Sequence, residues 1–142
     1  MHWMLLPLKR YADFTGRSRR MEYWMFSLGL AMAVFLFICA MFASFDFRGN
    51  TEDMGFPAMV ILFFGLGIVG WLAIIVPSFA VSVRRFHDQD LSGWFVLLGF
   101  IPYIGGLVMI VFMCLPGTKG DNRYGPDPLD PDGVERLSRV FD

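Results

Sequence analysis

The sequence predicts an all-α membrane protein in which three transmembrane helices follow a short amphipathic helix at the membrane interface. Composition is the first observation behind this prediction. Of the 142 residues, 56% are apolar even without glycine, and they include 16 Phe and 10 Met. Soluble domains reach about 45–50% with glycine counted, and a soluble globule of this size has too little interior to bury the excess. A lipid bilayer accommodates such a chain.

The second observation is the absence of charge from three long runs. These uncharged runs cover residues 23–45, 54–83 and 91–118. A spanning helix needs about 20 apolar residues, and lipid offers no partner for unpaired backbone groups, so each run is expected to be helical. We therefore predict one membrane domain over residues 1–128, with spans at about 24–45, 57–83 and 93–115.

Two prolines lie inside the predicted spans and should bend them. Pro77 and Pro102 each remove one backbone hydrogen bond from their helix. Around Pro102, the flanking Gly99, Gly105 and Gly106 allow two interpretations of the third run. One kinked helix is the first choice, and a re-entrant hairpin turning at Pro102–Gly106 is the alternative.

Residues 3–14 have an amphipathic pattern. On a helical wheel, one side is apolar and the other carries Lys9, Arg10 and Asp13. Such a helix lies in the interface, with its aromatic side chains in the acyl boundary and its basic groups towards phosphate. The apolar side consists of Trp3, Met4, Pro7, Leu8, Tyr11 and Phe14.

Lys and Arg residues set the expected orientation. Five lie in the first twenty residues and two between spans two and three, against three in the segments on the other side. This bias favours a cytoplasmic N-terminus. Three full passes place the C-terminal tail outside, whereas the hairpin alternative returns it to the cytoplasm. The polar Pro/Gly-rich tail, 129–142, is expected either to form one amphipathic turn around Val134, Leu137 and Phe141 or to be disordered past residue 125.

Motifs for chemistry are scarce. The spacing of a phosphate-binding loop is absent around Gly117–Gly120, and His87 with Asp88 and Asp90 is a weak metal pattern that a solvated turn explains as well. The net charge of -1 gives no reason to expect nucleic acid. We predict no catalytic residue, no metal ligand, no cofactor and no nucleic-acid partner.

Basic residues border two of the spans and should face the same leaflet. Together they form a basic rim suited to anionic headgroups, at about 1 kcal/mol per charge near the surface. Glu22 and Asp88 are placed to pair with these arginines, and Trp24 is an interface anchor. The basic rim comprises Arg17, Arg19, Arg20, Arg84 and Arg85.

Three blocks of the chain resemble the bacterial inner-membrane family catalogued as domain of unknown function 805. These blocks are Phe14–Trp24, Arg84–Trp94 and Pro116–Pro128, and the resemblance runs from about residue 3 to 128. Gln89-Asp90 replaces the family's usual Gly after His-Asp, and the linker 46–56 is longer than in shorter relatives. The resemblance implies a multi-pass protein of the bacterial inner membrane and no particular activity.

The blocks and the charge pattern give the candidate residues for binding a headgroup or a partner. These candidates are Arg17, Arg19, Arg20, Glu22, Trp24, Arg84, Arg85, His87, Asp88, Trp94, Asn122, Arg123 and Tyr124. The expected function is that of a non-enzymatic protein contacting anionic lipid, a membrane-protein partner or a second copy of itself.

A small oligomeric transporter or channel is the alternative, although only a few hydroxyl groups give the spans polarity. A membrane enzyme using His87 and Asp88 as an acid–base pair is the third hypothesis, with no nucleophile or cofactor motif to support it.

Overall fold

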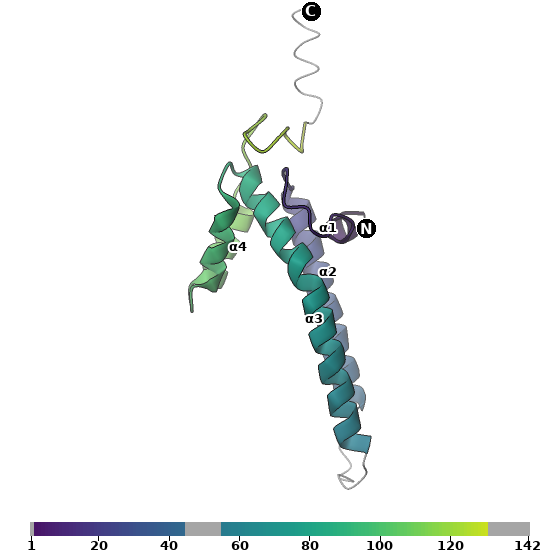
Figure 1. Cartoon of the computed structure of the whole chain (residues 1–142). Coiled ribbons are helices and arrows are strands. Elements are labelled where there is room, and N and C mark those ends of the chain that lie inside the picture. Colours follow the sequence, from purple (N-terminus) through teal and green to yellow (C-terminus); the bar gives the residue numbers. More distant parts are fainter. Residues whose placement is uncertain (1, 45–54, 131–142) are drawn as a thin grey trace, which may run out of the picture.

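The computed structural model describes residues 2–44 and 55–130. All of its elements are helices, and none of the described residues forms a strand, which confirms the predicted all-helical class. Figure 1 shows two long helices side by side, with a short hairpin beside the upper part of one of them. The acidic connection 46–53 and the expected turn around Val134 lie outside the described residues. The elements are α1 (His2–Lys9), α2 (Arg20–Ser44), α3 (Gly55–Asp88), η1 (Gly93–Phe100) and α4 (Gly105–Cys114).

The long helices α2 and α3 contain the first two uncharged runs. With 25 and 34 residues, they are about 38 and 51 Å long at 1.5 Å per residue, which exceeds the roughly 30 Å of a bilayer's hydrocarbon core. Both are long and apolar enough to cross a membrane. Their large side chains point outwards: Phe35, Ile61 and Trp71 are 65%, 72% and 63% exposed. Exposure of this kind suits lipid as the surrounding solvent.

The third uncharged run does not form one kinked helix, so that prediction is wrong. Its first half is the 3-10 helix η1 and its second half is α4, with a turn at 101–104. In this turn Tyr103 adopts a left-handed φ of 68°. Gly105 then packs directly on the preceding arm, since a Cβ there would lie 2.6 Å from the carbonyl oxygen of Leu98. Only glycine permits this approach, and the chain folds into the hairpin that was the alternative.

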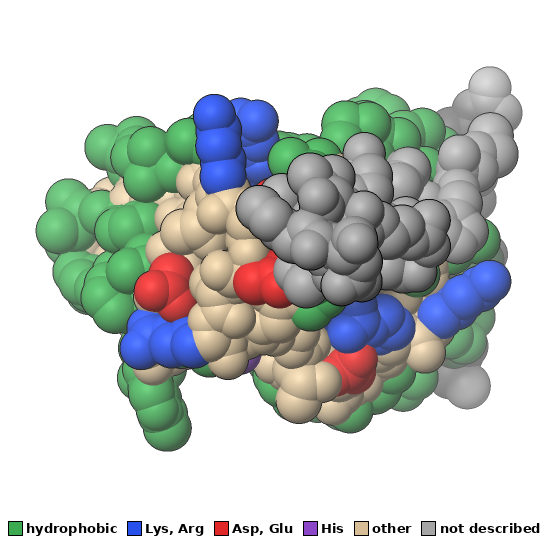
Figure 2. Space-filling view, turned by 90° about the horizontal axis from the view of Figure 1, so that it is seen from above, with side chains coloured by type: hydrophobic (Ala, Val, Ile, Leu, Met, Phe, Trp, Pro, Cys, Tyr) green, Lys and Arg blue, Asp and Glu red, His purple; other side chains and the backbone are tan. Residues whose placement is uncertain are grey.

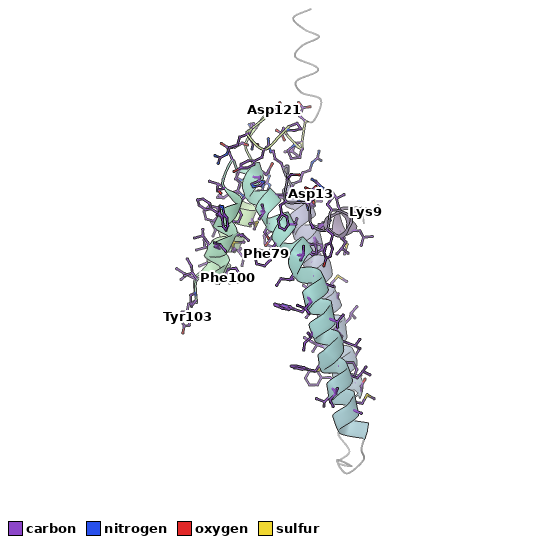
Figure 3. All side chains as sticks on the ribbon, in the orientation of Figure 1. Lys9, Asp13, Phe79, Phe100, Tyr103 and Asp121 are labelled. Atoms are coloured by element: carbon purple, nitrogen blue, oxygen red, sulfur yellow. The ribbon has the colours of Figure 1, made fainter. Side chains whose placement is uncertain are left out.

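The hairpin reverses the direction of the chain. Tyr103 lies at its tip, far from Asp121, which lies beyond the upper end of α3 (Figure 3). Eight residues of 3-10 helix and ten of α-helix rise about 16 and 15 Å, roughly half of the hydrocarbon thickness. The segment after α4 therefore starts beside the end of α3.

Aromatic rings fix the hairpin to α3. Phe86 is fully buried, and its ring centroid lies 6.0 Å from that of Phe95 and 5.6 Å from that of Phe112. Phe95 and Phe112 also meet each other, at 6.2 Å. These three side chains come from α3, η1 and α4. Burying them against one another holds the two arms at the polar end of α3.

The N-terminal segment packs against both long helices. α1 is shorter than the predicted 3–14 helix, and Met4 packs so closely on Gly29 of α2 that a Cβ there would lie 2.6 Å from Met4 Cε. After α1, the hydroxyl of Tyr11 donates a hydrogen bond of 2.8 Å to the carbonyl oxygen of Ala73. This carbonyl has no helical donor because residue 77 is proline. Tyr11 thus satisfies the backbone gap that Pro77 leaves in α3.

Candidate functional site

Three segments that are far apart in the sequence meet at one end of α2 and α3. The backbone N–H of Ser18 donates to Arg84 O at 3.1 Å, and that of Thr118 donates to Asp88 O at 2.8 Å. Asn122 Nδ2 donates to His87 O at 2.9 Å. We call this unit the polar cluster; it consists of residues 16–22, 84–90 and 117–127.

Arg17 joins all three segments of the polar cluster. Its Nε donates to Asp88 Oδ1 at 3.0 Å, and its two terminal nitrogens donate to the carbonyl oxygens of Gly120 and Thr118, each at 2.6 Å. The residue is only 7% exposed. Its planar guanidinium suits this fixed set of acceptors. Its charge is balanced within the protein by the carboxylate of Asp88.

Asp88 lies between two buried guanidinium groups. One carboxylate oxygen accepts from Arg17, and the other pairs with Arg85 of the same helix. Arg85 also donates to the carbonyl oxygen of Leu115, at the end of the hairpin. Gly117 packs against the carboxylate of Asp88 so closely that a Cβ would overlap it. The carboxylate therefore ties α3 to the first segment and to the chain leaving α4.

A second buried pair connects the two long helices. Arg84 Nη2 lies 3.2 Å from Glu22 Oε1, and both side chains are at most 4% exposed. These two atoms are close enough to attract but are not aligned as a hydrogen bond, so the contact is chiefly electrostatic. Arg84 Nε also reaches Ala80 O at 3.4 Å. Because both charges are buried, removing either side chain would leave the other charge buried without a counter-ion, which is strongly destabilising.

The outer layer of the polar cluster is aromatic and partly exposed. The ring of His87 stacks on Tyr124 with centroids 3.8 Å apart and planes 4° apart. Arg123 lies over the same tyrosine at 4.9 Å and pairs with Asp90 at 3.0 Å. His87 and Asp88 face different partners, so the structure does not assemble them as an acid–base pair.

Two carboxylates outside the helices are held in their charged form. Hydrogen bonds from Thr15, with the nearby Arg10, hold the pKa of Asp13 well below its usual range. The backbone N–H groups of Leu129 and Gly120 donate to Asp127 and lower its pKa. Both groups fix turns in the chain.

The structure separates the predicted candidates into two groups. The sequence predicted that five arginines form a basic rim facing headgroups, with Glu22 and Asp88 placed to pair with them. In the structure Arg17, Arg84 and Arg85 are buried, as are Glu22 and Asp88. Arg20 and Arg123 are exposed, and Arg19, His87, Asn122 and Tyr124 are half-buried. Trp24 and Trp94 are 40% and 77% exposed and lie outside the contacts that form the polar cluster. Binding by any of these residues stays a prediction.

The sequence interpretation missed residues in the third segment. The carbonyl oxygen of Thr118 accepts from Arg17, and its backbone N–H donates to Asp88 O. Asp127 accepts from the backbone N–H groups of Gly120 and Leu129. Lys119, next to Thr118, is exposed. Only their place within the Pro116–Pro128 block indicated a role. Backbone acceptors of this kind carry no side-chain signal that a sequence could show.

No described residues are placed to form a metal site. Within 2–44 and 55–130, no group of three His, Cys, Asp or Glu residues is placed to hold an ion. Cys39 and Cys114 are exposed and unbridged.

A pair of long apolar helices, a half-length hairpin and a charged cluster at one end define a helical membrane protein. The chain belongs to the family described as "Protein of unknown function (DUF805)", whose model matches residues 11–126. This confirms the family resemblance of the three blocks.

Two of the relatives are named as inner-membrane proteins. The chain is 41% identical to "Inner membrane protein YhaH" of Escherichia coli (strain K12) over 132 residues, which make up 92% of this chain and all of that protein. It is 40% identical to "Inner membrane protein YhaI" of the same organism over 133 residues, 90% of this chain and 96% of the relative. "Uncharacterized protein YiiR" matches at 24% identity over 144 residues, 83% of this chain and 87% of the relative. No solved structure matches.

These comparisons identify an inner-membrane protein and leave its biochemical activity undefined.

Proposed function

We propose that this chain is a non-enzymatic inner-membrane protein whose polar cluster lies at the cytoplasmic surface and contacts anionic lipid headgroups. One observation carries the proposal. The three charged segments fold into one unit at one end of the apolar helices. Some cations of this unit form buried ion pairs with carboxylates, and others are exposed. Arg20, Lys119 and Arg123 are exposed, and Figure 2 shows Lys and Arg side chains at several places around the edge of this end, next to hydrophobic side chains.

Two spans and a re-entrant hairpin are the proposed topology. The hairpin is about half as long as a bilayer's hydrocarbon core is thick, and it brings residues 116–130 back to the start of α2. Of the 12 Lys and Arg residues, only Arg48 lies in the connection between α2 and α3. Cytoplasmic segments carry the excess of Lys and Arg. This distribution supports a cytoplasmic location for both the N-terminus and the tail.

The cations divide between two roles. Arg17, Arg84 and Arg85 are at most 7% exposed and pair with carboxylates, so they hold the polar cluster together. The exposed cations meet water or headgroups, where each contributes about 1 kcal/mol of attraction to an anionic surface. The cations available to lipid therefore differ from the predicted basic rim. The three buried arginines are excluded, and the exposed Lys119 and Arg123 are added.

A transporter or channel has less support from the structure. Ser78 Oγ donates to Ile74 O and Ser82 Oγ donates to Ser78 O, both at 2.8 Å. Their protons are thus used within α3. No ionisable side chain lies in the uncharged run 54–83, whereas ion paths through membranes usually contain one.

Reporter fusions test the topology. Green fluorescent protein and alkaline phosphatase would be fused after residue 50 and after residue 142. We expect phosphatase activity only at residue 50 and fluorescence only at residue 142. Phosphatase activity at residue 142 would contradict the re-entrant hairpin and remove the tail from the cytoplasm.

Tryptophan quenching tests the contact with anionic lipid. The other three tryptophans would be changed to Phe, so that only Trp94 fluoresces. Its fluorescence would be measured in vesicles that contain brominated phosphatidylglycerol or brominated phosphatidylcholine, because the bromine atoms of neighbouring lipids quench it. We expect phosphatidylglycerol to be enriched around the wild type and not around a variant with Gln in place of Lys9, Arg20, Lys119 and Arg123. A matched variant that exchanges Lys and Arg at the same four positions should keep the preference. Equal quenching by both lipids around the wild type would contradict the proposal.

A further inference from the structure

A basic pocket lies beside the start of α2. Its volume is about 500 Å³. It lies between the first turn of α2 and the segment that follows α4, at the boundary between the polar cluster and the lipid-facing surface. Its wall contains the cations Arg19, Arg20 and Lys119, the carboxylates Asp88 and Asp127, and the neighbouring residues Met21, Pro116, Gly117, Thr118, Pro128 and Leu129.

Both carboxylates of the pocket are already engaged by the protein. Asp88 is shared between Arg17 and Arg85, and two guanidinium groups more than offset its charge. Asp127 accepts from the N–H groups of Gly120 and Leu129 at 3.0 and 2.8 Å. Asp127 keeps its charge, and Arg19 lies near enough to help lower its pKa, so the charge of Arg19 is set against that carboxylate. Arg20 and Lys119 are then the cations in excess in the wall, and the pocket favours an anion.

The wall of the pocket contains apolar side chains as well as basic ones. Met21 and Leu129 are 58% and 74% exposed at its edge. Arg20 makes a long contact of 3.5 Å with the carbonyl oxygen of Cys114, which places its guanidinium near the end of the hairpin, and Lys119 is exposed. A ligand that satisfies both kinds of side chain carries a phosphate next to hydrocarbon. Basic pockets beside cytoplasmic helix ends recognise phospholipid headgroups in this way.

We infer that this pocket binds the headgroup phosphate of one anionic phospholipid. Arg20 and Lys119 contact the phosphate, and Met21 and Leu129 contact the glycerol and the first methylenes of the acyl chains. The inference rests on the proposed function, because it needs the polar cluster at the headgroup level. It adds one defined site to a general attraction between exposed cations and lipid.

Native mass spectrometry of the full chain in detergent tests the site. The protein would be titrated with phosphatidylglycerol, with phosphatidylethanolamine as the zwitterionic comparison. We expect one tightly held phosphatidylglycerol per chain, and about fivefold weaker binding for each cation removed. Arg20→Gln with Lys119→Gln should thus weaken binding about 25-fold, and Lys119→Gln alone, which changes only an exposed side chain, about fivefold.

A matched pair of substitutions separates the pocket from the rest of the surface. Lys9→Gln with Arg123→Gln removes the same charge from the general lipid-facing surface outside the pocket, and should weaken binding of the first lipid much less than the pocket pair does. Far-UV circular dichroism checks that each variant keeps its helices. If Arg20→Gln alters the spectrum, the single Lys119→Gln variant decides the result.

The outcomes distinguish this inference from the proposed function. Equal weakening by the two pairs, together with preserved enrichment of phosphatidylglycerol around Trp94, would overturn the pocket and leave the proposed function standing. Absence of that enrichment would remove both. Binding of phosphatidylethanolamine as tight as that of phosphatidylglycerol would overturn the anion preference. Displacement of the lipid by millimolar inorganic phosphate would show that the ligand is soluble phosphate instead.

Discussion

Asp88→Asn should be one of the most damaging single changes in the polar cluster. The carboxylate of Asp88 is the acidic partner of both Arg17 and Arg85, and the three side chains are at most 7% exposed. Asparagine has nearly the same shape but no charge, so both guanidinium groups stay buried without a counter-ion. Removing one partner from a buried ion pair costs about 3–5 kcal/mol.

Asp90→Asn is the matched control for this change. Asp90 lies two residues further along the chain and pairs with Arg123 at 3.0 Å, but these side chains are 47% and 59% exposed. Exposed pairs contribute about 0.2–1 kcal/mol. The two substitutions remove the same charge in the same segment and differ in burial. We therefore expect their effects to differ by at least about 2 kcal/mol.

Unfolding with sodium dodecyl sulfate measures both effects. The purified protein in mild detergent micelles would be titrated while circular dichroism follows its helices, giving a free energy of unfolding for each variant. Arg17→Gln and the double variant with Asp88→Asn complete a cycle, in which the double variant should cost less than the two single variants combined. Equal losses for Asp88→Asn and Asp90→Asn would refute the reasoning that burial makes this carboxylate indispensable.

Two further changes test close contacts in the fold. Gly117→Ala should lower the free energy of unfolding by about 1–3 kcal/mol, because the new methyl group overlaps Asp88. Gly106→Ala is the control and should not lower it, because nothing lies within 4 Å of an added Cβ there. Equal effects of the two changes in the same detergent titration would contradict this reasoning. Tyr11→Phe should lower the free energy of unfolding by about 1 kcal/mol, because Ala73 O loses its donor. In a background with Pro77→Ala, residue 77 supplies an N–H to Ala73 O, and the same change should cost much less. An equal loss in that background would disprove the role of Tyr11.

The two long helices could be predicted from the sequence because their signal is local. Every residue from 23 to 45 and from 54 to 83 is uncharged, and lipid requires a helix wherever such a run is long enough. α3 continues to Asp88, past the predicted end at residue 83. Arg84 and Arg85 extend it because Glu22 of α2 neutralises Arg84 and Asp88 of the same helix neutralises Arg85. The first of these pairs depends on a contact with another segment.

The hairpin could not be chosen from the sequence alone. Pro102 is compatible with a kink as well as with a turn, and the two glycines after it permit either. The structure favours the turn because Gly105 packs on the backbone of Leu98 and Gly99, and because Phe95 and Phe112 meet on Phe86. Contacts between two arms of a hairpin are not visible in a pattern of apolar residues.

The sequence located the three charged blocks, but its first choice of topology placed the third block on the opposite side of the membrane, and it missed the contacts among them. Charge gathers in the three blocks, and these blocks do meet. Arg17 was interpreted as a surface cation because a sequence gives no sign that its acceptors are Thr118 O and Gly120 O, 101 and 103 residues away. Backbone carbonyls are present at every residue, so only the fold shows which ones an arginine uses.

The distance along the chain between Arg17 and its acceptors has a consequence for synthesis. While the polypeptide is growing, this guanidinium is made long before Asp88, Thr118 and Gly120, so until Asp88 follows it is an unpaired charge next to the first apolar helix. During that interval it can act as one of the basic residues that set the orientation of the first span. Once the last segment arrives, the same charge is enclosed. One arginine would thus first guide insertion and then join the first and third segments of the polar cluster, and a chain that stops before residue 118 would keep Asp88 as its counter-ion but lack the two carbonyl acceptors.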